Sequence, residues 1–76
     1  MIDRVVGDHH LFAVGVRFER EGAVHYCGSV NAVPRNRFST ERKAAIFDFD
    51  QELFETADAA ANYAIERVTT IISTQR

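Results

Sequence analysis

Two aspartates, separated by a single phenylalanine, lie in the stretch AAIFDFDQEL, residues 44–53. Asp48 and Asp50 follow four apolar residues, so both carboxylates would lie on the same side of a strand, close to its end. Carboxylates with this spacing suit a Mg²⁺ site, and they could also serve as a nucleophile and a general acid or base. No other stretch of the chain carries residues so suggestive of catalysis.

The stretch resembles the opening strand of the haloacid-dehalogenase-like phosphatases, in which a hydrophobic strand runs into Asp-x-Asp-Gly-Thr. The resemblance implies that Asp48 is a nucleophile and Asp50 a general acid or base. However, Gln51 replaces the glycine of the turn, and Glu52 replaces the threonine that holds phosphate. That family also needs a doubly wound parallel sheet with a lysine and further acids downstream, whereas only 26 residues follow Asp50. We therefore expect no enzyme, no catalytic residue and no cofactor.

Metal binding without catalysis is a separate question. Asp48, Asp50 and Glu52 would project from one side of a continuing strand, and such a ladder of carboxylates suits a hard cation. The alternative, which we favour, is that acids on the solvent side keep the strand soluble and lead into a helix N-terminus. Whether Asp48 and Asp50 bind a cation stays open. His25 and Cys27 would share one face without a third ligand, and the other two histidines lie too far away, so no transition-metal site is predicted.

The composition is that of one small globular domain. The 76 residues are 46% hydrophobic and 26% charged, which excludes disorder as the main state. A net charge of −2 and a pI of about 5.8 give no overall signal for nucleic acid or an anionic membrane. The longest apolar run, LFAVGV, is far shorter than the ~20 residues that span a bilayer. We expect a soluble, cytoplasmic protein.

Two segments, 10–18 and 24–30, alternate in the manner of half-buried strands. In both, the even positions carry the larger side chains, so these are predicted to face the core. A two-residue loop between the strands would pair Phe18 with His25 and set an apolar side against a polar one. A three-residue loop pairs Phe18 with Val24, and we therefore predict the longer loop.

A third strand is predicted over 43–51 and a helix over 57–73. Thr56 has the character of an N-cap, and the helix shows an apolar stripe at helical spacing. The stripe comprises Ala57, Ala61, Ala64, Ile65, Val68, Ile71 and Ile72. Its alanine-rich half should approach the large aromatics of the sheet, namely Phe12, Phe47 and Phe49.

These elements predict an α+β domain: a three-stranded antiparallel sheet (β-β-β-α) with one C-terminal helix packed on one face. Residues 9–76 would form this domain. Residues 1–8 would be either a flexible N-terminus or a short edge strand.

The basic segment 34–43, PRNRFSTERK, carries four of the nine basic residues of the chain. These are Arg35, Arg37, Arg42 and Lys43, with the aromatic Phe38 among them. Arginine and an aromatic ring in a loop could grip phosphate and stack on a base. The predicted layout is similar to that of double-stranded-RNA-binding domains and the DNA-binding heads of some phage integrases, which are mostly basic, unlike this chain. Weak nucleic-acid or anion binding through this segment is therefore our alternative function.

One helix cannot cover both faces of a sheet. The uncovered face should therefore carry small and apolar residues and be prone to association. We expect Leu11, Ala13, Cys27 and Ile46 to line a contact there. A chain this short gains stability from association. The sequence thus predicts a small non-enzymatic interaction module that binds itself, as a dimer, or another protein.

Overall fold

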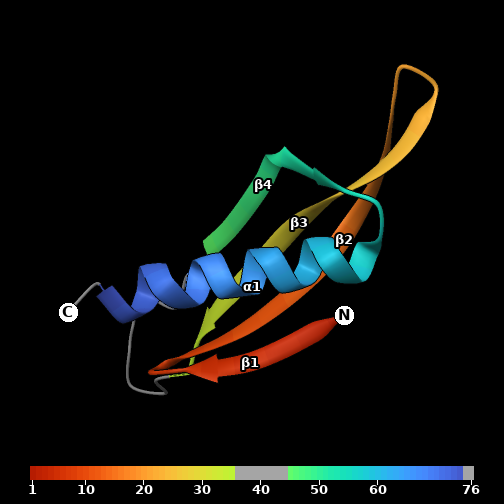
Figure 1. Ribbon diagram of the computed structural model, residues 1–76. Helices are drawn as coiled ribbons and strands as arrows, with labels where there is room; N and C mark the ends of the chain where they lie inside the picture. The colour runs from red at the N-terminus through yellow and green to blue at the C-terminus, as the bar shows by residue number, and fades with distance from the viewer. Residues whose placement is uncertain (36–44, 75–76) are drawn as a thin grey trace.

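A four-stranded antiparallel sheet with a single helix on one face forms the structure, a computed structural model that describes residues 1–35 and 45–74 (Figure 1). The elements are β1 (Ile2–Val6), β2 (His9–Arg20), β3 (Ala23–Pro34), β4 (Ala45–Phe54) and α1 (Ala57–Thr74). The strands lie in the sheet in chain order, each antiparallel to its neighbour. The α+β class and the C-terminal helix agree with the prediction. The predicted count of three strands is wrong, because β1 adds an edge strand beside β2.

The β2–β3 hairpin turns through two residues instead of the predicted three. Glu21 and Gly22 form the turn, and both have positive φ, at 53° and 81°. Positive φ at both positions is typical of a type I′ turn, whose twist matches that of the flanking strands. Phe18 therefore lies opposite His25, the pairing that we had expected the loop to avoid.

The shorter turn reverses the predicted orientation of β2. Leu11 and Ala13, at odd positions, are fully buried beneath the helix, opposite Ala32 and Val30 of β3. The prediction that the even positions of β2 face the core is therefore wrong, whereas the same prediction for β3 is confirmed. The larger even residues of β2 lie on the face away from the helix: Phe12, Val14, Val16 and Phe18.

Small residues face the helix because α1 crosses the sheet in contact with its backbone. Gly15 of β2 and Gly28 of β3 are cross-strand partners. A Cβ atom on Gly15 would overlap the backbone of Ala57, and one on Gly28 would overlap Ala60 and Ala64. The alanine-rich half of α1 thus packs on two glycines. Phe47 and Phe49 do pack against the core, as predicted, but Phe12 lies on the opposite face.

The helix begins where the sequence predicts. The backbone N–H of Ala59 donates to Oγ1 of Thr56 at 3.1 Å, which is the bond of an N-cap residue. The apolar stripe then faces the sheet, and its most buried members are Ala61, Ala64, Ile65 and Val68. Ala60, which the predicted stripe did not include, is also buried.

Polar and apolar contacts both join the edge strand β1 to the helix. The guanidinium of Arg4 lies 2.8 Å from the carboxylate of Glu66 and donates to the hydroxyl of Thr69 at 3.2 Å. Ile2 and Val6, on the same side of β1, pack against the core. Residues 2–6 are therefore part of the folded domain.

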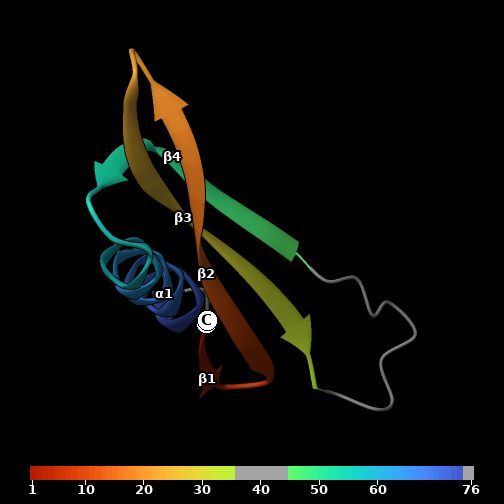
Figure 2. The ribbon, with the colours of Figure 1, turned by 90° about the vertical axis from the view of Figure 1, so that its right-hand side faces the viewer.

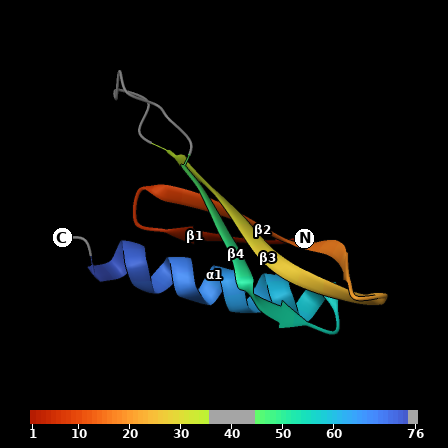
Figure 3. The ribbon, with the colours of Figure 1, turned by 90° about the horizontal axis from the view of Figure 1, so that it is seen from above.

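The molecule is elongated, with principal extents of 48, 20 and 18 Å. Sheet and helix form two layers (Figure 3), and the β2–β3 hairpin projects past the start of α1 (Figures 1 and 2). Strand β4 separates from β3 near this hairpin. Gly28 pairs with Phe49 and Tyr26 pairs with Phe54, so that four residues of β4 lie opposite one residue of β3. Residues 50–53 thus form a bulge opposite Cys27, and the end of the hairpin is largely a two-stranded ribbon.

Candidate interaction surface

An apolar stripe runs along β2 on the face that α1 does not cover. Val14 and Val16 are 39% and 44% exposed, and Phe12 and Phe18, at the two ends, are half-buried. We call these four residues the β2 stripe. Alternation along the strand places all four on one face, and the described elements leave that face open. Large apolar side chains therefore occupy the middle of an uncovered sheet.

Aromatic contacts hold both ends of the β2 stripe in place. The ring of His10 stacks on Phe12, with centroids 4.2 Å apart and an interplanar angle of 20°. At the other end, Phe18 lies against His25 with centroids 6.1 Å apart. The carboxylate of Asp3 is 3.4 Å from Nε2 of His10. The stripe is thus flanked by rings that restrict its side chains before any partner binds.

Polar residues border the stripe on the neighbouring strands. Asp3 of β1 and Asn31 of β3 lie on either side of Phe12, and the hydroxyl of Ser29 donates to Asp48 of β4 at 2.8 Å. Two exposed apolar residues on the edge strands interrupt this polar border, with Val5 49% and Ile46 69% exposed. An apolar centre with a polar rim is the usual anatomy of a protein–protein interface.

Only two of the four predicted contact residues lie on this face. Leu11 and Ala13 are 0% exposed beneath α1, so the prediction that they lie on the uncovered face is wrong. Cys27 is half-buried and lies opposite Val16, and Ile46 is well exposed near the edge of the sheet. The β2 stripe itself was missed, although the glycines of β2 and β3 and the turn sequence Glu-Gly were signals that could have located it.

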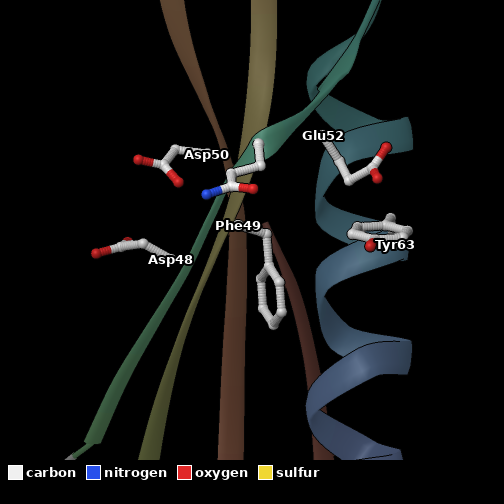
Figure 4. Close-up of a pocket in the computed structure, with 6 residues that line it drawn as sticks. Asp48, Phe49, Asp50, Glu52 and Tyr63 are labelled. Carbon is white, nitrogen blue, oxygen red and sulfur yellow. The ribbon is translucent and has the colours of Figure 1, made fainter.

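The acidic residues of β4 do not converge on one point. Asp48 and Asp50 extend to the side away from α1, whereas Phe49 points towards the helix (Figure 4). Glu52 lies on the helix side, close to Tyr63 (Figure 4). The predicted ladder of three carboxylates is therefore wrong, because the bulge over 50–53 turns the chain between Asp50 and Glu52.

This arrangement offers little support for phosphoryl transfer or metal binding. Six residues line a shallow pocket at the bulge: Asp48, Phe49, Asp50, Gln51, Glu52 and Tyr63. Within residues 1–35 and 45–74, no three His, Cys, Asp or Glu side chains are placed to hold a metal ion. The sheet is antiparallel, unlike the parallel sheet of the phosphatases that the motif resembles. The resemblance thus does not extend beyond the motif itself.

The thiol of Cys27 is poorly suited to act as a nucleophile. Partial burial raises its pKa, and the nearby carboxylates of Asp50 and Asp48 raise it further. The thiol therefore stays protonated at neutral pH, and only the thiolate is an effective nucleophile. Cys27 contributes to the open face as a small apolar group.

Most of the basic segment lies outside the described residues, namely Arg37, Phe38, Arg42 and Lys43. Arg35 is exposed at the end of β3, and its backbone N–H donates to the carbonyl of Asp8 at 2.7 Å. Nucleic-acid or anion binding through this segment stays a prediction.

Comparisons of this chain with protein-family models, curated proteins and solved structures gave no significant match. In the part of the chain that the structure describes, no helix combines the length and apolar character needed to cross a membrane.

Proposed function

We propose that this protein is a small non-enzymatic interaction module that self-associates through the open face of its sheet, with the β2 stripe at the centre of the contact. The observation that carries the proposal is the stripe itself: four large apolar side chains, fixed at both ends, in the middle of a face that residues 1–35 and 45–74 leave without a second layer. Removing such a surface from water is favourable by about 25 cal/mol per Å².

A second copy of the chain is the partner that the geometry supports best. In an isologous pair each copy buries the same stripe, so one surface serves both sides. Two such sheets would pack face to face about 10 Å apart, as in a β-sandwich. A standard interface buries roughly 800 Å² on each partner. A sheet in a molecule 48 Å long and 20 Å wide offers a face of that order.

The first test is the mass of the protein in solution as a function of concentration, measured by analytical ultracentrifugation. We expect a monomer–dimer equilibrium that Val16→Lys weakens at least tenfold, because the lysine ammonium would have to be desolvated at the centre of the contact. The matched control is Thr70→Lys on the exposed side of α1, which should leave the equilibrium unchanged.

Two results would contradict self-association. One is a monomeric mass at every concentration up to the millimolar range. The other is a dimer that Val16→Lys leaves intact while the fold is preserved. If the protein is instead monomeric and binds short duplex DNA or RNA with an affinity that falls as salt rises, the alternative function replaces this one.

A further inference from the structure

We infer that the two copies pair with their β2 strands antiparallel, about a two-fold axis that lies between the two sheets and passes over Gly15. Phe12 and Asp3 of one copy then meet Phe18 and Arg20 of its partner. The inference rests on the proposed self-association and specifies which residues come into contact.

The end of the β2 stripe near the hairpin turn contains a place for an aromatic ring. A shallow depression lies there, lined by Phe18, Glu19, Arg20, Cys27 and Asp50. It forms where β4 bulges away from β3, since residues 50–53 face only Cys27. At the opposite end, the ring of Phe12 is held against His10 on the same open face. An aromatic ring can pack on Phe18 and Cys27, the apolar members of this lining, and the other three lining residues are charged.

The spacing of these two features is compatible with two-fold symmetry. Phe12 and Phe18 are six residues apart on one strand, or about 20 Å at ~3.3 Å per residue. In an isologous contact, residue i of one copy meets residue j of the other, and j meets i. An antiparallel pairing centred at residue 15 brings Phe12 to Phe18 twice, and it places Val14 against Val16 between them.

Charge favours the antiparallel orientation over the parallel one. Arg20 lies on the open face near the turn, and the ion pairs found among the described residues do not involve it. Asp3 is the cross-strand neighbour of Phe12, and its side chain is 63% exposed. An antiparallel pair sets Arg20 of one copy beside Asp3 of the other. A parallel pair, with its axis along β2, would set Arg20 against Arg20 and Asp3 of one copy against Asn31 of the other, because Asp3 and Asn31 lie on either side of Phe12.

A charge-reversal cycle tests this orientation, with the dimer dissociation constant as the readout. Asp3→Lys and Arg20→Glu should each weaken the dimer about three- to tenfold, because each creates two repulsive contacts at the rim. The double variant should return to within about twofold of the original protein. Arg67→Glu, on the exposed side of α1, is the matched control and should have no effect.

A mixing experiment gives a second readout that does not depend on rim charge. In a Cys27→Ser background, proteins carrying Phe12→Cys and Phe18→Cys should form a disulfide-linked dimer rapidly when mixed, and slowly when oxidised separately. Rapid linkage of each variant with itself would overturn the antiparallel arrangement, as would a double charge variant weaker than either single one. In both cases a persisting dimer leaves the proposed function standing, whereas a monomeric parent protein overturns both.

Discussion

At the scale of single residues, Gly28 and its partner Gly15 determine how the two layers meet. Neither position has a positive φ, so the absence of a side chain, and not backbone freedom, is what the structure requires there. Ala60 and Ala64 occupy the space that a Cβ on Gly28 would need. The close approach lets short side chains such as Ala13 and Ala61 reach the core.

The substitution Gly28→Ala should therefore destabilise the protein by about 1–3 kcal/mol, the usual cost of overfilling a packed interior. The sign of this change in stability is informative, because replacing glycine by alanine in an unobstructed strand stabilises a protein by roughly 0.5–1 kcal/mol. Chemical denaturation would measure the change, with Ser29→Ala on the open face as a control that should cost less than about 0.5 kcal/mol. A variant as stable as the parent would show that α1 does not rest on this glycine.

At the scale of elements, α1 is defined by local signals at its start and by packing along its length. Thr56 caps the helix through the N–H of Ala59, and Asp58 places a negative charge in the first turn, where the helix dipole favours it. Further along, Thr69 and Thr70 donate their hydroxyls to carbonyls one turn earlier. Of these hydrogen bonds, only the one to Thr56 satisfies a backbone N–H that has no acceptor within the helix.

We expect Thr56→Ala to lower the free energy of unfolding by about 1 kcal/mol, the usual cost of losing an N-cap. Thr70→Ala removes the same hydroxyl from an exposed position inside the helix. It should change stability by a few tenths of a kcal/mol at most, since alanine is the better helix former. Thermal and chemical unfolding of both variants would measure the difference. Equal effects would mean that Thr56 does not cap α1.

At the scale of the whole molecule, the part of the chain that the structure describes forms two layers and leaves one face of the sheet uncovered. Leu11 and Val30 of the sheet pack with Ile65 and Val68 of α1, and these four side chains form the centre of a small core. The opposite face keeps the β2 stripe in contact with water. A domain of this size buries only roughly 60% of its unfolded surface, so covering the second face would add substantially to its stability.

Self-association then predicts that stability depends on protein concentration. The midpoint of denaturation should rise as the concentration passes through the dimer dissociation constant, because the dimer forms only from folded chains. In the Val16→Lys variant this rise should move to concentrations at least tenfold higher, in proportion to the weaker dimer. Fluorescence or circular dichroism at concentrations a hundredfold apart would measure both. A midpoint of the parent protein that does not change over that range would argue against the dimer.

Some features of the fold could be predicted from the sequence because their causes are local. Thr56 and the apolar stripe after it locate α1, and the alternation in 10–18 and 24–30 locates two strands. The proposed contact surface could not be predicted in this way. Alternation shows that a strand has two different faces, but not which one lies against the helix. The larger side chains of β2 suggested the wrong face.

The sequence by itself determined the α+β class, the antiparallel hairpin and the start of the helix, since each depends on residues close together in the chain. Tertiary structure alone decided that Leu11 and Ala13 are core and that Phe12, Val14, Val16 and Phe18 face outward. The physical reason is the packing of α1 across Gly15 and Gly28. A helix in contact with a sheet backbone needs small residues beneath it, so here the smaller face of β2 is the one that became buried.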